Sequence, residues 1–345
     1  MKREAAPAMP ITSEEAVDPA PRSPLSVGLV LVAATLLLLA VGTAVGSLGW
    51  EPLWSGADTA NAILWEIRLP RSMGAWLAGA LLGLAGAVAQ GLFRNPLADP
   101  YLLGSATGAA FGVAVMLVLI GVTPMAAGGW VARLGLTGAG FVGAVVAVLV
   151  TLGLARGVQH TLRLLLAGVI VGMVFGALSA LVMFRVPDIL RSMQAFLLGT
   201  TGFLGWGSVG LLGVVFALSV LVAVGFSPAL DALALGESTA ISLGIPLPKV
   251  RVGLVGVMAL ATGAAVAQVG LIAFIGLLAP HLIRAAVKPT HRWLLPLAAL
   301  AGGVLLLAAD VLARWLLAPQ ELPVGVLTAI LGGGYLLWLM HRRPL

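Results

Sequence analysis

The chain has 345 residues, of which 60% are hydrophobic and only 9% are charged. About a quarter of the residues of an average soluble domain are charged, so this composition excludes a soluble enzyme and a disordered protein. There is no cysteine, which excludes disulfides and thiolate chemistry. The formal charge of +6 is explained by basic cytoplasmic loops of a membrane protein, so no nucleic-acid partner is expected.

The apolar residues form long blocks separated by short polar segments, which is typical of an all-α polytopic membrane protein in contact with lipid. Residues 1–24 are charged and rich in proline, and they are predicted to be a disordered cytoplasmic tail. Residues 25–345 are predicted to be the transmembrane domain. Hydropathy places ten spans in it, near 25–48, 72–92, 101–121, 137–155, 164–184, 209–226, 250–270, 272–287, 294–313 and 324–340.

The basic residues orient these spans. With a cytoplasmic N-terminus, 13 of the 19 Lys and Arg residues fall on the cytoplasmic side, and the outside set is Arg68, Arg71, Arg133, Arg185, Arg191 and Arg314. The opposite orientation would invert the positive-inside bias. Both termini are therefore predicted to be cytoplasmic.

Two short sequences recur at one offset of 178 residues. Leu69-Pro70-Arg71 returns as Leu247-Pro248-Lys249, and Ala87-Val88-Ala89-Gln90 returns as Ala265-Val266-Ala267-Gln268. An offset of five spans turns the second copy upside down. The sequence therefore predicts an inverted 5+5 repeat, an organisation that recurs in transporters with the pathway near the repeat interface.

The chain lacks the motifs of catalysis and of metal binding. It has no Walker A loop, HExxH or GxSxG sequence, and its four histidines are scattered, so neither a catalytic nor a metal site is expected. Asp310, near a helix end, is the main ionisable residue in the spans. An ion-coupled secondary carrier would show carboxylates within the spans, and an intramembrane enzyme would show a catalytic constellation. The protein is therefore expected to move or to anchor something without an ion relay of its own, with its energy supplied by another subunit.

Two polar segments interrupt the apolar blocks in ways that allow two interpretations each. The segment from Arg94 to Pro100 is either a plain tight turn or irregular backbone lining a pathway. The segment 227–248 contains two potential short helices, at 229–234 and 237–243, with Gly236 between them and Gly244 as a C-cap. These helices lie on the membrane surface or fit a groove on a partner.

At these segments the chain resembles the FecCD-type permeases, the membrane subunits of type II ABC importers for iron-siderophores, haem and cobalamin. The matching pieces run in family order from about residue 65 to 338, and each is short while the set is specific. They are Arg68–Arg71, Gln90-Gly91 with Arg94–Pro100, Leu164–Gly168, Ala234–Glu237 with Leu243-Gly244, Pro280-His281, and Ala309–Arg314 with Glu321–Gly325.

The resemblance implies a type II ABC importer permease fold with ten helices in the bacterial inner membrane. It also implies a homodimer with a second copy of the chain, two ATPase subunits that use ATP and Mg, and a periplasmic substrate-binding protein. The permease itself then binds no cofactor. The coupling loop 227–248 would contact the ATPase through Leu235, Gly236, Glu237 and Ser238.

The resemblance further assigns roles to residues at both ends of the spans. Arg68, Arg71 and Arg314 match positions that receive acidic residues of the binding protein. The alternative for Arg314 is an i,i+4 pair with Asp310, worth a few tenths of a kcal/mol. The alternative for Arg68 and Arg71 is that their side chains snorkel to the lipid headgroups. The cytoplasmic gate positions match Asn95, Leu97, Thr161 and Leu162. The fifth span, with its tandem GxxxG, would line the pathway, and its glycines are Gly168, Gly172 and Gly176.

The cargo is predicted to be haem, with a ferric siderophore or cobalamin as the alternatives. Arg185 follows the apolar run 178–184 at the outer end of the fifth span. In a homodimer two copies of Arg185 can each meet one haem carboxylate. The alternatives for this residue are an ion pair with Asp188 or snorkelling to the membrane interface.

Overall fold

The computed structural model describes residues 23–46, 49–50, 58–120, 130–155 and 161–342, which are almost entirely helical. The predicted tail therefore lies outside the described residues up to position 22. The elements are α1 (Pro24–Ala44), β1 (Val45–Gly46), β2 (Gly49–Trp50), α2 (Asp58–Ile63), the π-helix η1 (Leu64–Arg68), α3 (Leu69–Phe93), the 3₁₀-helix η2 (Pro100–Leu103), α4 (Ser105–Ile120), α5 (Trp130–Leu154), α6 (Thr161–Arg185), the 3₁₀-helix η3 (Pro187–Ile189), α7 (Leu190–Leu198), α8 (Trp206–Gly225), α9 (Ser227–Ala234), α10 (Glu237–Ser242), α11 (Leu247–Val269), α12 (Ile275–Ala286), α13 (His291–Trp315) and α14 (Val324–Arg342).

The ten predicted spans each coincide with one helix. In the described ranges, seven helices are long and apolar enough to cross a membrane, and α4, α12 and α14 are shorter apolar helices. The β-structure in these ranges is a two-stranded ribbon after α1, in which Val45 lies opposite Trp50 and Gly46 opposite Gly49. The predicted all-α polytopic membrane fold is confirmed.

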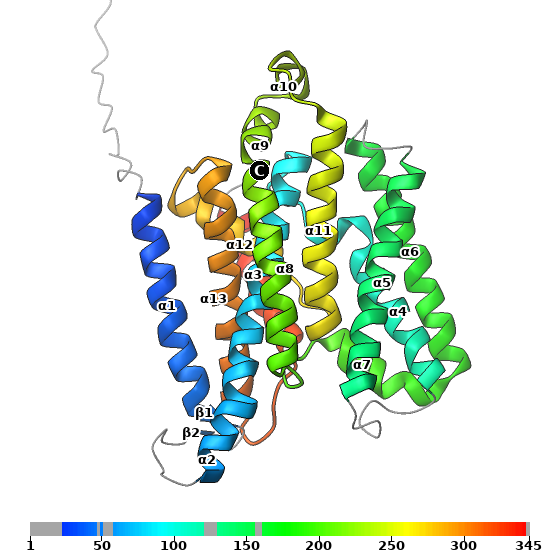
Figure 1. Cartoon of the computed structure of the whole chain (residues 1–345), viewed down its shortest axis with the longest axis vertical. Helices are drawn as coiled ribbons and strands as arrows, with labels where there is room; N and C mark the ends of the chain where they lie inside the picture. Colours follow the sequence, from blue (N-terminus) through cyan, green and yellow to red (C-terminus); the bar gives the residue numbers. More distant parts are fainter. Residues whose placement is uncertain (1–22, 47–48, 51–57, 121–129, 156–160, 343–345) are drawn as a thin grey trace, which may run out of the picture.

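Helix α3 is the centre of the bundle, with α1 at one edge and α4, α5 and α6 at the other (Figure 1). Its most apolar window is 94% buried, against 6% for α1 and 22% for α6 and α8, whose apolar faces suit lipid. Small residues allow this close packing: a Cβ at Gly83 would lie 2.3 Å from the Ala298 carbonyl oxygen, and one at Gly86 would lie 1.7 Å from that of Gly276.

Helices α11 and α13 run antiparallel to α3 (Figure 1). A Cβ at Gly91, near the end of α3, would contact the ring of His291 at the start of α13, and Arg71 at the start of α3 pairs with Asp310 near the end of α13. We call the end with α9 and α10 the α10 end, and the opposite end, with α2, the α2 end. The predicted inverted repeat requires that its matching helices, α3 and α11, run in opposite directions, and they do.

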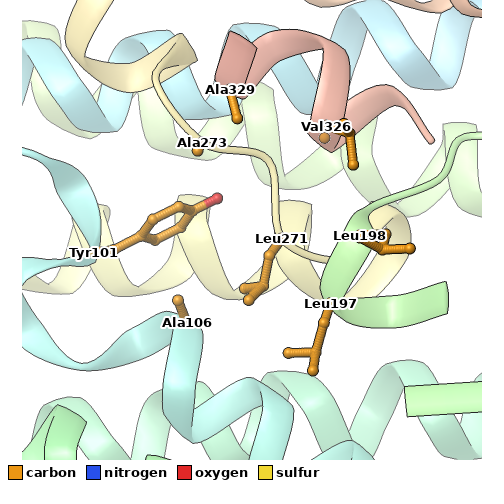
Figure 2. Close-up of a pocket in the computed structure, with 9 residues that line it drawn as sticks. Tyr101, Ala106, Leu197, Leu198, Leu271, Ala273, Val326 and Ala329 are labelled. Carbon is orange, nitrogen blue, oxygen red and sulfur yellow. The ribbon is translucent and has the colours of Figure 1, made fainter. Parts of the chain in front are cut away.

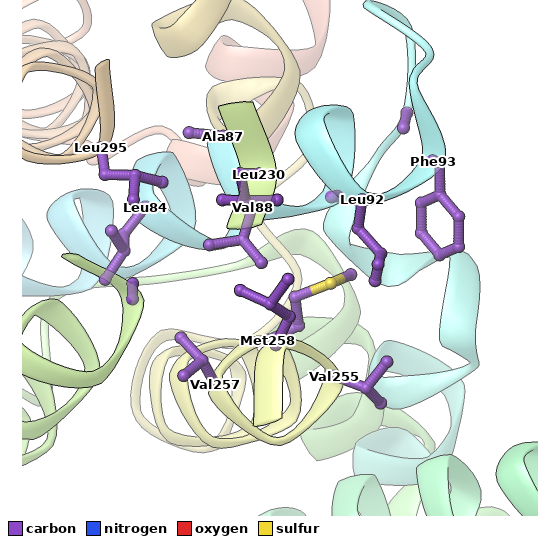
Figure 3. Packing of buried hydrophobic residues seen from close by; sticks show 14 of the residues in the cluster. Leu84, Ala87, Val88, Leu92, Phe93, Leu230, Val255, Val257, Met258 and Leu295 are labelled. Atoms are coloured by element: carbon purple, nitrogen blue, oxygen red, sulfur yellow. The ribbon is translucent and has the colours of Figure 1, made fainter. Parts of the chain in front are cut away.

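A core cluster holds the α10 end together. Figure 3 shows Leu230 of α9 beside Val88 of α3 and Met258 of α11, and all three side chains are buried. Helix α9 is therefore packed on the bundle, although it projects from the end of α8. The start of α1 lies at this same end (Figure 1).

Helix α12 is shorter than the eighth predicted span. It covers 12 residues, or about 18 Å at 1.5 Å per residue, which is less than a membrane thickness. The preceding residues 270–274 are irregular, and the amide of Leu271 among them donates to the carbonyl of Phe196 in α7 at 3.1 Å. Just before them, the carbonyl of Val269 at the end of α11 accepts from the amide of Thr200, in the segment after α7, at 2.8 Å. Irregular backbone inside a membrane protein needs such internal partners. The sequence did not predict α7, which supplies them.

Candidate functional site

Two short helices, α9 and α10, lie at the α10 end (Figure 1). The sequence placed them at 229–234 and 237–243, and α9 and α10 confirm both helices and the break between them. The break occurs at Gly236, which has φ +116° and lies in the region that favours glycine. Leu235, Ile241 and Leu243 are 62–70% exposed. Apolar side chains presented in this way fit a groove on a partner.

The underside of α9 is fixed to the bundle by apolar packing and by a polar contact. Leu230 and Leu233 are buried. Asp231 accepts the backbone N–H of His291 at 3.0 Å, and its carboxylate lies 2.7 Å from the Nδ1 of the same histidine. The start of α13 is thereby capped from α9. Movement of α9 would therefore be transmitted to α13.

Glu237 meets two arginines from other parts of the chain. One of its carboxylate oxygens, Oε1, lies 2.6 Å from Nη2 of Arg251, in the first turns of α11, and 3.6 Å from Nη2 of Arg94, at the end of α3. We call this cluster the Glu237 junction. The sequence analysis placed Glu237 in the coupling loop but missed both partners, because neither is near it in the chain.

The segment after α3 is a structured turn. Arg94 ends α3 in the left-handed conformation, with φ +49°. The Asn95 side-chain oxygen accepts the Leu97 N–H at 2.9 Å, and Asp99 accepts the Tyr101 N–H at 2.8 Å and so caps η2. Burial raises the pKa of the Asp99 carboxyl. Leu97 at the tip is 58% exposed.

The predicted gate residues lie at the α10 end. Asn95 and Leu97 are exposed on the turn after α3, and Leu162, in the first turn of α6, is 77% exposed. The side chain of Thr161 lies outside the described residues. A gate needs side chains that can meet a second copy or close on a cargo. The exposure of Leu97 and Leu162 satisfies that requirement, and their gating role stays a prediction.

The three glycines of α6 have different surroundings. A Cβ at Gly168 would lie 2.0 Å from the Leu102 carbonyl oxygen, so this glycine allows α6 to pack on η2. Gly172 faces Thr107 and Gly104 at 3.6–4.0 Å, whereas a Cβ at Gly176 would meet nothing within 4 Å. Close helix contact was the predicted use of the GxxxG pattern. Gly168 makes that contact within the chain, and Gly176 leaves open space beside α6.

At the α2 end, a network joins three buried charged residues to the partly exposed Glu321. Both Asp310 oxygens are used: Oδ1 lies 3.0 Å from Nη2 of Arg71, and Oδ2 lies 2.7 Å from Nη2 of Arg314. Arg71 also contacts Glu321 at 2.9 Å, and Thr201 donates its hydroxyl to Asp310. Two guanidinium groups and two carboxylates leave the network electrically neutral.

Burial in this network changes the interpretation of two predicted docking residues. The side chains of Asp310 and Arg314 are 0% and 2% exposed, and Arg314 also donates to the carbonyls of Gly42 and Val45 at 2.7 and 2.9 Å. The i,i+4 pair considered for Arg314 is present. The estimate of a few tenths of a kcal/mol applies to exposed pairs and is too small for this buried one. Arg71 does not snorkel to lipid, because its guanidinium binds Asp310 and Glu321.

The third predicted docking residue has a different environment. Arg68, the last residue of η1, is half-buried and donates to the Thr43 carbonyl at 3.3 Å. Its side chain also packs closely under Gly46 of β1. Arg68 is the most accessible of the three predicted docking arginines, so a charge change there disturbs the structure least.

Arg185 is exposed at the end of α6, next to Phe184, which is 80% exposed. Within the described ranges, no ion pair joins Arg185 to Asp188, which removes the local pairing considered for it. The guanidinium is therefore open to solvent, headgroups or an anionic ligand at the α2 end.

A cavity of about 330 Å³ lies between α4, α7, α14 and the irregular segment before α12. Figure 2 shows the Tyr101 ring between Ala106 of α4 and Ala273, with Val326 and Ala329 of α14 across the cavity. The Tyr101 hydroxyl donates to the Ile272 carbonyl at 3.1 Å. The lining is otherwise apolar: Ala106, Leu197, Leu198, Leu271, Ala273, Gly325, Val326 and Ala329.

Comparisons with known proteins agree with this architecture. A model of the FecCD transport family matches residues 29–342. The chain belongs to the FecCD transport family. It is 38% identical over 328 residues to the hemin transport system permease protein HmuU of Yersinia pestis, covering 92% of this chain and 96% of that one. It is 41% identical over 323 residues to the vitamin B12 import system permease protein BtuC of Salmonella paratyphi A, covering 92% and 94%.

A solved structure has the same fold. It is an inward-facing ABC transporter, provisionally assigned to the metal-chelate type, with a TM-score of 0.83 and 26% identity over 93% of this chain and all of that one. The predicted family resemblance is thereby confirmed. The protein is a multi-pass membrane permease of the ABC importer type and is not itself an enzyme.

Proposed function

We propose that the chain is the membrane permease of an ATP-driven importer that moves an iron-bearing chelate from the periplasm to the cytoplasm, and that this chelate is haem. The observation that carries this proposal is the alignment of nearly the whole chain with permeases of import systems, one for hemin and one for vitamin B12. The alternatives within the same class are a ferric siderophore and cobalamin.

The environment of Asp310 argues against an ion-coupled secondary carrier. In such carriers a membrane-embedded carboxylate gains and loses a proton or a metal ion. Within the described spanning helices, Asp310 is the buried acidic side chain, and both of its oxygens bind arginine. Its charge is neutralised within the protein. This supports an energy source outside this chain.

The exposed apolar side chains of α9 and α10 support an ATPase partner. Leu235, Ile241 and Leu243 present an apolar patch outside the apolar bundle, at the end where the positive-inside rule places the cytoplasm. We propose that this patch, with Gly236, Glu237 and Ser238, enters a groove on the ATPase. ATP and Mg bind that subunit, and two copies serve a homodimer of this chain.

The opposite end supports a docking site for a substrate-binding protein. Arg68 precedes the buried Arg71 by one helical turn in the chain, and the partly exposed Glu321 contacts Arg71. We propose docking over this surface, with Arg68 as the direct contact. Arg71 and Arg314 shape the surface through the buried network, because their guanidinium groups are covered in the isolated chain.

The cargo proposal depends on Arg185 and on the apolar face of α6. In a homodimer with α6 at the central pathway, two Arg185 side chains would stand near its outer mouth. Haem is a flat apolar ring with two carboxylates, and this combination of an apolar wall and two cations suits it. Cobalamin lacks these two free carboxylates, so the same arginines would contribute little to its transport.

One purification and one transport assay test the proposal. The chain is tagged, extracted in mild detergent and analysed by mass spectrometry for a co-purifying ATPase, and the cognate binding protein is purified for its absorption spectrum. A co-purifying ATPase and a Soret band on the binding protein are expected. Proteoliposomes holding the complex should then take up haem only with ATP. Uptake driven by an ion gradient without ATP would overturn the importer assignment, and a bound corrinoid or siderophore would overturn haem alone.

A further inference from the structure

The Glu237 junction connects three segments that the function assigns to different tasks. Glu237 is the first residue of α10, Arg251 lies in the first turns of α11, and Arg94 ends α3 immediately before the turn that carries Leu97. Both arginines face the same carboxylate oxygen, Oε1. The junction is therefore a direct contact between the helix proposed to bind the ATPase and the turn proposed to close the pathway.

The two contacts of Glu237 differ in strength. The Arg251 contact is short, at 2.6 Å, and the Arg251 side chain is only 4% exposed. The Arg94 contact is 3.6 Å, and the Arg94 side chain is 43% exposed. A close pair with one buried partner resists separation, because separation leaves that charge without its counter-ion. An exposed pair is weak and readily exchanged with water.

The turn beyond Arg94 is linked onward to α6. Arg94 holds the left-handed conformation that ends α3, and the turn continues through Asp99 into η2. The backbone of η2 lies against Gly168 of α6, where no side chain intervenes. A displacement of Arg94 is thus passed along a short, stiff segment to the helix proposed to line the pathway.

We propose that Glu237 is a positioning residue that transmits the position of α10 to the Asn95–Asp99 turn. The Arg251 contact keeps α10 attached to α11, and the Arg94 contact forms or breaks as the ATPase moves α10. The inference rests on the proposed function, because it requires an ATPase at α10. The negative charge of Glu237 at the N-terminal end of α10 also interacts favourably with the helix dipole, but that local role does not involve Arg94.

Removing the weak contact tests this linkage. Arg94→Gln keeps a polar side chain but removes the charge that faces Glu237, and Arg292→Gln is the matched control, because Arg292 is an exposed arginine at the same end. Haem uptake per ATP hydrolysed is measured in proteoliposomes holding the full complex. We expect Arg94→Gln to lower this ratio about fivefold, at the lower limit of typical coupling factors, with the ATPase still bound and Arg292→Gln unchanged.

A double-mutant cycle separates the pair from the individual side chains. Glu237→Gln and the combination of both substitutions are measured in the same assay. If the contact carries the coupling, the double variant is no worse than Glu237→Gln alone, because the second change removes nothing further. Losses that multiply independently would overturn the proposal.

A distance measurement reads the linkage without transport. The chain has no cysteine, so spin labels at Leu97→Cys and Leu243→Cys need no background removal. On ATP binding to the complex, both labels should move in the parent protein, whereas with Arg94→Gln the Leu243 label should move and the Leu97 label should not. Equal movement of both labels in Arg94→Gln would overturn the linkage. If no ATPase binds the parent chain, the proposed function fails, and this inference fails with it.

Discussion

The two ends of the bundle use charge in opposite ways. At the α2 end, Arg71, Asp310 and Arg314 are buried and saturated with partners from α1, α13 and the segments before α8 and α14. At the α10 end, Glu237 and Arg94 are each about one-third or more exposed and lie 3.6 Å apart, while Glu237 also holds the buried Arg251. Buried pairs are costly to separate and exposed pairs are not. The α2 end is therefore built to stay fixed, and the α10 end can rearrange.

This difference fits the tasks proposed for the two ends. A docking surface is effective when its shape is fixed before the partner arrives, because little ordering remains to oppose binding. A coupling region must instead have two arrangements of similar free energy, so that ATP binding can shift it. The following predictions concern substitutions in four places: the fixed α2 end, helix α3 between the ends, the movable α10 end and the mouth of the proposed pathway. They are given from the largest expected effect to the smallest.

The largest effect is expected from Asp310→Ala. The substitution leaves the buried guanidinium groups of Arg71 and Arg314 without their shared carboxylate. Breaking a buried pair in this way costs about 3–5 kcal/mol of stability. Thermal unfolding in detergent should show a large loss. Glu321→Gln is the control, because Glu321 is 31% exposed and its pair should contribute about 1 kcal/mol or less. Equal losses for both variants would contradict the distinction between buried and exposed pairs on which the comparison of the two ends depends.

A smaller loss is expected from Gly86→Ala, in the middle of α3. The added Cβ would lie 1.7 Å from the Gly276 carbonyl oxygen, so α12 must move away. Overpacking of this kind costs about 1–3 kcal/mol. The control is Gly210→Ala on α8, where a Cβ meets nothing within 4 Å and alanine favours the helix. If the two variants unfold at the same temperature, the close approach of α3 and α12 is wrong.

At the movable end, Gly236→Val should damage coupling more than folding. Gly236 has φ +116°, a conformation that a β-branched residue adopts only with strain of about 1–3 kcal/mol. The break between α9 and α10 should shift, and the exposed Leu235 side chain should move away from the position proposed to contact the ATPase. Uptake and substrate-stimulated ATPase activity should fall together, roughly tenfold, which is the effect of 1.4 kcal/mol. Gly213→Val, on α8 with open space around it, is the control. Normal coupling in Gly236→Val would remove the coupling role of this loop.

Much of this architecture follows from local sequence properties. Hydropathy predicted all ten apolar helices, because each is a continuous apolar run, and Gly236 and Gly244 predicted the ends of the short helices through their need for positive φ. The Asp310–Arg314 pair was predicted as one alternative, since residues four apart meet on a helix. Each of these signals is contained within one helix or within the residues that directly flank it.

The long-range contacts could not be predicted in this way. Arg71 and Glu321 are 250 positions apart in the chain. Glu237 at the start of α10 contacts Arg94 at the end of α3, and the two residues are separated by several helices in the sequence. Both contacts therefore exist only once the bundle has formed. Helix α7 was missed because its nine residues include Arg191, Ser192 and Gln194, which break the hydropathy signal. The burial of Arg71 and Arg314 was missed for the same reason: a sequence gives their charge and position, but not the partners that cover them.

The smallest effect is expected at the mouth of the proposed pathway, from Arg185→Ala. Arg185 is exposed and has no ion pair with Asp188 among the described residues, so its removal should leave folding unchanged. Its attraction for a haem carboxylate acts in an exposed, solvated place and is worth at most about 1 kcal/mol, or roughly a fivefold change in rate. Haem uptake in proteoliposomes should slow by up to that factor, while basal ATPase activity persists. Arg191→Ala is the matched control, because Arg191 is an exposed arginine on the neighbouring helix α7. Raising the salt concentration should slow haem uptake by the parent protein toward the rate of Arg185→Ala, because salt screens the same attraction. Equal uptake by Arg185→Ala and the parent protein at low salt would show that Arg185 has no part in haem transport.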